Sequence, residues 1–422
     1  MTTELSNFAA RLREFILSFS DAGDDVRSLH STATGRANNE PPHVGSYEKD
    51  FNQLALELFA LQFKHNVAYR KICGARGLTP GIVEHWTQIP AVPAAAFKEL
   101  ELTCLAPGER TTVFHSSGTT EQKPSRHYHG AESLAVYEAS LWSWFARHVV
   151  PPGLGSGVSA LGLCILTPPP TQAPYSSLVH MFETVRQKLG GAETAFVGKL
   201  AADDGAWTLD FNAVVDALSF GGDGASPLPQ TPDARPLLLL GTAFSFVHLL
   251  DYLAERNLRF DLPAGSRVME TGGYKNRSRS LPKTELHQLI TERLGIPPSR
   301  IICEYGMSEL SSQAYDLGAL ASRRRVSSLC SEQDAGGTPA LPGLDTRHFI
   351  FPPWARVQII SPETGREVAD GETGLIRIFD LANVFSVMAI QTEDLGIRHG
   401  DGFELIGRAA LAEARGCSLM TV

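Results

Sequence analysis

Four hydroxyl side chains surround one glycine in a short stretch, and two cationic residues, Lys123 and Arg126, follow it. The stretch consists of Ser116, Ser117, Gly118, Thr119 and Thr120. A glycine can adopt positive φ and let the backbone curve, so that successive N–H groups and the hydroxyls form a concave anion site. The G-x-x-x-x-G-K-[ST] pattern of a Walker loop is absent. We interpret the stretch as a triphosphate-binding loop; the alternative is a polar surface turn.

The hydroxyl-rich stretch follows a predicted strand that ends at Phe114, and short apolar segments alternate with helical patterns after it. We predict strands at residues 158–166, 236–240, 267–271 and 301–303, and helices at residues 47–73, 132–148, 177–189 and 281–294. This alternation favours an α/β fold with mostly parallel sheets in several layers. In such sheets ligands bind beyond the carboxyl ends of the strands. Residues 116–120, 241–242, 272–273 and 305–306 all follow strands and should meet at one edge.

The pattern of the chain divides it into three regions. Residues 1–45 combine an amphipathic helix over residues 4–18 with a loose linker rich in Asp, Gly, Ser, Asn and Pro. Residues 46–354 carry the α/β pattern. From residue 355 to residue 422, short alternating segments separated by Gly-containing turns indicate a small antiparallel β subdomain, with a tail that carries Cys417.

The composition limits the function classes. The chain has 422 residues, of which 43% are hydrophobic and 20% are charged, as in soluble globular proteins. A net charge of −9 argues against nucleic acid or an anionic membrane as the main partner. No apolar run approaches the roughly 20 residues that cross a bilayer, so we expect no membrane insertion. The six cysteines lack zinc spacing, and we expect free thiols in the cytoplasm, with Cys303 among the structural ones.

Residues 116–120 resemble the phosphate loop of the acyl-adenylate-forming enzymes, although Lys123 and Pro124 reverse the usual Pro-Lys order. Residues 304–309 are similar to the Tyr-Gly-x-Thr-Glu motif of the same superfamily. The resemblance implies that Tyr305 stacks on adenine, that Glu309 holds Mg²⁺ and that Asp394 binds the ribose hydroxyls. It also implies nucleotide contacts by Gly272, Gly273, Gly306, Ser308 and Arg408. Taken singly, these segments also fit a strand-to-helix corner and a solvated turn.

Residues 46–422 resemble one branch, the acyl-protein synthetases of bacterial bioluminescence, which are the synthetase component of the fatty acid reductase complex. The chain stops at Val422, so we expect the superfamily's C-terminal lid and its lysine to be missing. The branch transfers the acyl group to a cysteine near its own C-terminus, and Cys417 occupies the matching position. A thiolate is a good acyl acceptor, and Arg415 could lower the pKa of Cys417. The alternative is an unreactive tail cysteine.

These observations predict an ATP- and Mg²⁺-dependent ligase that activates a carboxylic acid as acyl-AMP, with Cys417, Lys123 and Arg126 as catalytic residues. By resemblance the acid is a long-chain fatty acid and the partner is an acyl reductase; an acyl carrier protein is the other possible partner. Tyr175, Phe182, Phe244 and Phe246 could line a pocket that would also suit an aromatic acid. The alternatives are a biosynthetic ligase that passes its acyl group to a carrier-protein thiol or an amine, and a non-catalytic subunit that binds nucleotide or carries an acyl group.

Overall fold

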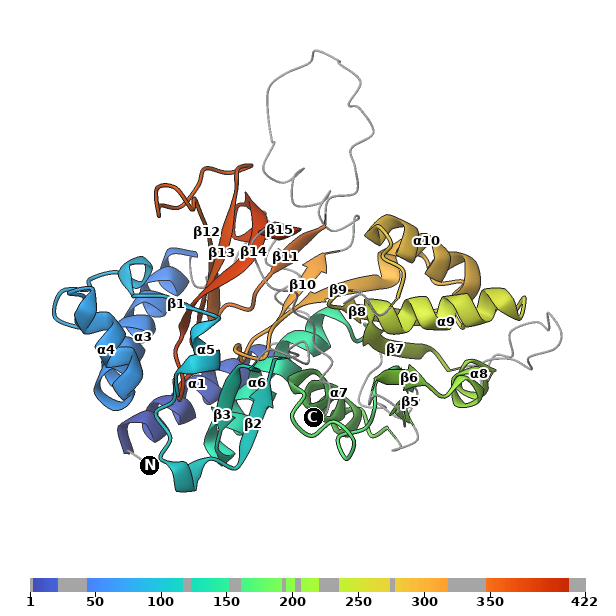
Figure 1. Cartoon of the computed structure of the whole chain (residues 1–422), viewed down its shortest axis with the longest axis horizontal. Helices are drawn as coiled ribbons and strands as arrows, with labels where there is room; N and C mark the ends of the chain where they lie inside the picture. The colour runs from blue at the N-terminus through green and yellow to red at the C-terminus, as the bar shows by residue number, and fades with distance from the viewer. Residues whose placement is uncertain are drawn as a thin grey trace, which may run out of the picture.

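One mixed sheet of eleven strands organises the molecule (Figure 1). The computed structural model describes residues 3–21, 44–116, 123–151, 161–191, 195–201, 206–219, 235–273, 278–317 and 347–409. The strand order is β12-β13-β14-β15-β11-β10-β9-β8-β7-β4, and β1 (Val92–Pro93) pairs with β14. The fold is therefore α/β, as the sequence predicted, with both strand directions in one sheet.

The middle of the chain forms the parallel half of the sheet. Its strands are β4 (Gly162–Ile165), β7 (Leu237–Thr242), β8 (Arg267–Thr271) and β9 (Ile301–Tyr305). The side chains of β7 alternate between two cores: Leu238 and Leu240 pack with α6 and α7, and Leu237 and Leu239 pack with α8, α9 and α10. All six residues of β7 are buried, which is why this strand is a continuous apolar run.

Most remaining strands are antiparallel and extend the same sheet. They are β10 (Ala314–Leu317), β11 (His348–Ile350), β12 (Ala355–Ile360), β13 (Thr373–Asp380), β14 (Ala389–His399) and β15 (Gly402–Arg408). Two hairpins stand apart, β2 (Thr112–His115) with β3 (Arg126–His129), and β5 (Gly198–Leu200) with β6 (Trp207–Leu209). Because β11 pairs with β15, the sheet continues across the boundary predicted near residue 355.

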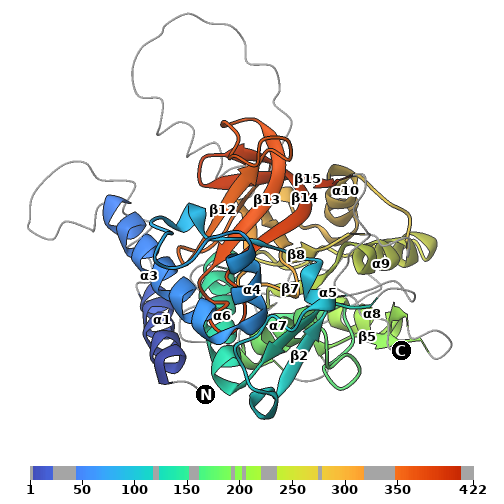
Figure 2. The ribbon, with the colours of Figure 1, turned by 60° about the vertical axis from the view of Figure 1, so that its left-hand side comes forward.

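Helices cover both faces of the sheet. They are α1 (Thr3–Asp21), α3 (Val44–His65), α4 (Val67–Ala75), α5 (Ala96–Glu99), α6 (Ala131–His148), α7 (Ser177–Lys188), α8 (Phe211–Ser219), α9 (Ala243–Glu255) and α10 (Lys283–Leu294). Short 3-10 helices occupy Trp86–Gln88, Pro107–Glu109 and Pro298–Arg300. The N-terminal helix α1 lies against α3 and α6 (Figure 2) and buries Leu5, Phe8, Leu12 and Ile16, as its amphipathic pattern predicted. No helix in the described ranges is long and apolar enough to cross a membrane.

One local prediction was wrong, and one predicted strand is confirmed over part of its length. The single helix expected over residues 47–73 is two helices, because the side chain of Asn66 caps the second one by accepting a hydrogen bond from the N–H of Tyr69 at 3.0 Å. The strand expected at residues 158–166 is shorter where it is described, since β4 covers Gly162–Ile165 and residues 152–160 lie outside the described part.

Candidate active site

A pocket of 250 Å³ lies at the carboxyl ends of β8 and β9, where parallel sheets usually bind ligands. Residues from distant parts of the sequence line it: His115, Ser116, Ser177, Thr271, Gly272, Gly273, Lys283, Glu304, Tyr305, Gly306, Met307, Ser308, Glu309, Asp394, Leu405, Gly407 and Arg408. The structure thus brings together nine residues singled out in the sequence, namely Ser116, Gly272, Gly273, Tyr305, Gly306, Ser308, Glu309, Asp394 and Arg408.

In the pocket wall, a hydrogen bond links Tyr305 to Asp394 and an ion pair links Asp394 to Arg408. The Tyr305 hydroxyl donates to Asp394 Oδ2 at 2.9 Å, and Arg408 Nε lies 3.3 Å from Asp394 Oδ1. The aromatic ring of Tyr305 packs edge-on against the ring of Phe403, with 5.2 Å between centroids. The phenol ring and the carboxylate are therefore held by β9, β14 and β15 together, so a ligand meets them already in place.

Glu309 is buried in the same wall, and a network behind it fixes its backbone. Asn383 Nδ2 donates to the carbonyl oxygen of Glu309 at 2.9 Å, and Ser308 Oγ donates to Glu309 Oε2 at 3.1 Å. Asp380 anchors the next turn, because its Oδ2 accepts from the N–H groups of Ser311 and Ser312 at 2.9 and 2.8 Å. A carboxylate beside a hydroxyl is an all-oxygen donor set, which suits Mg²⁺.

The two charged lining residues that were missed as site residues are Glu304 and Lys283. Burial raises the pKa of Glu304 to about 7. The hydrogen bond that its carboxylate accepts from the Thr271 hydroxyl lowers the pKa but does not offset the effect of burial. The available signal for Glu304 was an acidic residue at the end of an otherwise apolar strand. Lys283 begins α10, and its Nζ lies 3.1 Å from Glu270 Oε1. No spacing in the sequence connects Lys283 with the pocket, because α10 reaches it only through the fold.

Several other predicted residues do not line this pocket or cannot be placed. Lys123 is half exposed, with its Nζ 3.3 Å from Glu99 Oε2, and Arg126 lies on β3 with its guanidinium 5.9 Å from the Tyr128 ring. Ser117, Gly118, Thr119, Thr120 and Cys417 lie outside the described residues. Of the expected acid pocket, Phe182, Phe244 and Phe246 are buried in the two cores and Tyr175 is exposed. The roles predicted for these residues stay predictions.

Solved structures of other proteins share this fold. A structure of 2-hydroxyisobutyryl-CoA ligase in an open conformation, in complex with 2-HIB-AMP and CoA, matches with a TM-score of 0.56 at 12% identity, covering 89% of this chain and 75% of that one. The same enzyme in its thioesterification state matches with a TM-score of 0.57 at 13% identity, over 89% and 73% of the two chains. The fold is that of acyl-adenylate-forming ligases.

Sequence comparison is consistent with this class. No protein-family model matches the chain. The long-chain-fatty-acid–luciferin-component ligase of Vibrio harveyi is 21% identical over 384 residues, which cover 87% of this chain and 86% of that protein. The ligase of the same name from Aliivibrio fischeri is 26% identical over 197 residues, covering 44% and 45%. The chain is a distant homologue of the luciferin-component ligases.

Proposed function

We propose that the chain uses ATP to activate a carboxylic acid as acyl-AMP and then transfers the acyl group to the thiol of Cys417. The observation that carries this proposal is the pocket, which is lined both by the linked residues Tyr305, Asp394 and Arg408 and by the buried carboxylate of Glu309. Tyr305 offers a flat wall for adenine, and Asp394 offers a carboxylate to the two ribose hydroxyls. Gly272 and Gly273 let the backbone approach the nucleotide closely.

In the first step, a carboxylate oxygen of the acid attacks the α-phosphorus of ATP, and the bond from that phosphorus to the pyrophosphate oxygen breaks. The hydroxyl-rich loop at residues 116–120 neutralises the charge that develops on the phosphates, and the roles predicted for Lys123 and Arg126 require their cations to turn toward the pocket from the positions seen here. Glu309 would hold Mg²⁺, which would supply further charge neutralisation. Asp394 keeps the ribose in place during the attack.

In the second step, the Cys417 thiolate attacks the acyl carbonyl carbon, AMP leaves, and the thiol proton passes to solvent. Cys417 follows Arg408 by nine residues, which span about 30 Å when extended, so the thiol can reach the pocket wall from the end of β15.

Both relatives are named for a long-chain fatty acid, which supports a fatty acid as the substrate. An acyl reductase or an acyl carrier protein would then take the acyl group.

We place this reaction in the cytoplasm. Cys73, Cys104, Cys164 and Cys303 are free thiols, as is usual for proteins of a reducing compartment.

The test is acid-dependent ATP–pyrophosphate exchange with a panel of fatty and aromatic acids. Wild type and Cys417→Ala should both exchange, and only wild type should retain a hydroxylamine-labile acyl label. Cys104→Ser, which removes a partly buried thiol, is the matched control and should keep the label. A label that persists in Cys417→Ala would assign the thiol acceptor to another site. An absence of exchange with every acid would contradict the adenylation step and favour a non-catalytic subunit.

Asp394→Asn should raise the KM for ATP in this exchange by about 10- to 100-fold, because hydrogen bonds to a charged group contribute about 1.5–3 kcal/mol. Tyr305→Phe removes the hydroxyl that donates to Asp394 but keeps the ring, so its effect should be smaller. Steady-state exchange kinetics at varied ATP measure both. An unchanged KM in Asp394→Asn would remove Asp394 from the ribose site.

A further inference from the structure

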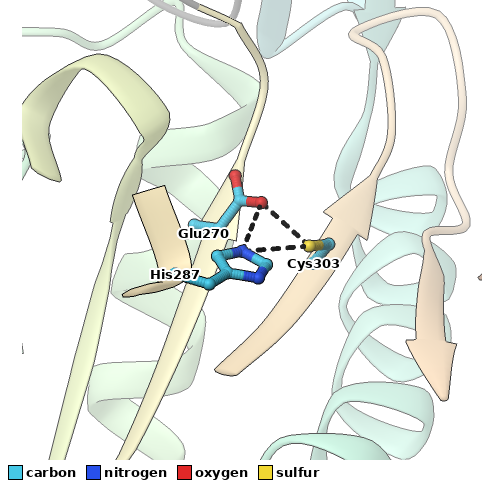
Figure 3. Close-up of side chains that lie close together, drawn as sticks. All are labelled: Glu270, His287 and Cys303. Atoms are coloured by element: carbon cyan, nitrogen blue, oxygen red, sulfur yellow. Dashed lines mark hydrogen bonds and ion pairs between the residues drawn. The ribbon is translucent and has the colours of Figure 1, made fainter. Parts of the chain in front are cut away.

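A second cavity, of 440 Å³, adjoins the nucleotide pocket and shares Lys283 and Leu405 with it. His287 of α10 and Cys303 of β9 line this cavity, and both contact Glu270 of β8 (Figure 3). All three side chains are buried. The three offer a nitrogen, a sulfur and an oxygen ligand within 4.8 Å of one another.

The distances among the three ligand atoms are close to those of a tetrahedral metal site. His287 Nε2 lies 3.4 Å from Glu270 Oε1 and 3.7 Å from Cys303 Sγ, and Cys303 Sγ lies 2.8 Å from Glu270 Oε1. Zinc bonds of about 2.3 Å to sulfur and about 2.0–2.1 Å to nitrogen or oxygen place tetrahedral ligands roughly 3.3–3.6 Å apart. Only the sulfur–oxygen pair has to widen, which a rotation of the Glu270 carboxylate provides.

The same imidazole nitrogen, Nε2, faces both Glu270 and Cys303. A nucleophilic triad needs one ring nitrogen toward the thiol and the other toward the carboxylate. The geometry is therefore unsuited to activating Cys303 as a nucleophile. Three ligand atoms that converge on one point suit a cation between them.

The charges of the site match a divalent ion. Two ion pairs lie close together here: Lys283 Nζ is 3.1 Å from Glu270 Oε1, and Arg347 Nη1 is 2.6 Å from Asp316 Oδ2. Arg347 therefore neutralises Asp316, and a metal ion would replace the Lys283 ammonium as the cation beside Glu270. The Lys283 side chain is 42% exposed and can withdraw toward solvent. Zn²⁺ with one carboxylate and one thiolate is neutral, as is the pair of Glu270 with Lys283.

We propose that Glu270, His287 and Cys303 bind a zinc ion, with a water from the cavity as fourth ligand and the Lys283 ammonium in the cation position when zinc is absent. On binding, the S–H bond of Cys303 breaks, a zinc–sulfur bond forms, and one proton passes to solvent without any redox change. Because binding releases the thiol proton, the apparent affinity for zinc should rise with pH.

Cobalt(II) titration of the chelator-treated, full-length protein tests the site without relying on activity. One equivalent should produce a thiolate-to-cobalt charge-transfer band that Zn²⁺ abolishes. Cys303→Ser should lose the band, whereas Cys164→Ser, which removes another buried free thiol, should keep it. Wild type without the band, or Cys303→Ser with an unchanged band, would overturn the proposal.

Two further variants keep the test decisive if Cys303→Ser does not fold, as judged by circular dichroism. His287→Gln removes a ligand and should weaken Zn²⁺ binding at least about 100-fold, measured by competition with a chelator of known affinity. Lys283→Gln removes the competing ammonium and should tighten Zn²⁺ binding about tenfold. If both variants bind Zn²⁺ as wild type does, the cluster is a structural ion pair with neighbouring polar groups.

Discussion

Glu309→Gln should lower the rate of acid-dependent ATP–pyrophosphate exchange by at least about 100-fold, because a bound metal ion is worth several kcal/mol of transition-state stabilisation. The carboxylate is buried in the pocket wall, and Asn383 holds its backbone through the 2.9 Å hydrogen bond to the Glu309 carbonyl. Glutamine preserves the size of the side chain and removes its charge. The loss should therefore come from weaker Mg²⁺ binding rather than from a rearranged pocket.

The dependence on magnesium separates these two causes. In Glu309→Gln, the Mg²⁺ concentration for half-maximal exchange should rise, and saturating Mg²⁺ should recover part of the rate. Glu57→Gln, which removes a carboxylate from a surface ion pair with Arg11, should leave the exchange unchanged. A Glu309→Gln variant with wild-type magnesium dependence would show that Glu309 does not hold the ion.

The difference in unfolding free energy between Glu304→Gln and wild type should be about 3 kcal/mol more favourable to the variant at alkaline pH than at acid pH. Burial raises the pKa of Glu304 from 4.5 to about 7, and the neighbouring Glu270 charge adds to the rise. Because the pKa of Glu304 is higher in the folded than in the unfolded protein, the free energy of unfolding is highest below pH 4.5 and falls as the pH rises through 7. Glutamine stays neutral throughout, and a shift of about 2.5 pKa units corresponds to about 3 kcal/mol.

Urea unfolding at a series of pH values measures this effect. The difference in unfolding free energy between Glu304→Gln and wild type should rise between pH 4.5 and pH 8 and then level off. Glu363→Gln is the control, because Glu363 is exposed on a turn and its difference from wild type should not vary in this way. A pH-independent difference in Glu304→Gln would mean that the carboxyl is solvated in the folded protein.

The sequence predicted the parallel strands well because their signals are local. The four leucines of Leu237–Leu240 form a continuous apolar run, and the Gly-Thr that follows marks the end of the strand, so six residues show both the strand and its end. The break at Asn66 was hidden because the apolar pattern continues on both sides of it, and only the cap formed with Tyr69 separates the helices. The periodic spacing of apolar residues indicates which side of a helix is buried, but it does not indicate where one helix ends and the next begins.

The pocket was predictable where one element carries a complete motif, as residues 304–309 do. It was not predictable where residues meet only in three dimensions. Glu270, His287 and Cys303 come from two strands and a helix. Glu270 precedes His287 by 17 residues, and His287 precedes Cys303 by 16, so the three do not form a compact sequence motif. Lys283 was missed for the same reason. Cys303 was expected to be structural, and its proposed role as a ligand rests entirely on neighbours supplied by the fold.

The last described strand, β15, ends at Arg408 in the wall of the pocket at the carboxyl ends of β8 and β9. Whatever follows it is thus tethered at the place where acyl-AMP would form. An acceptor thiol carried on the same chain, nine residues beyond Arg408, has an effective concentration of the order of millimolar, independent of the protein concentration. Acyl transfer to Cys417 would therefore follow first-order kinetics and be insensitive to dilution, and only the later handover to a partner would depend on diffusional encounter.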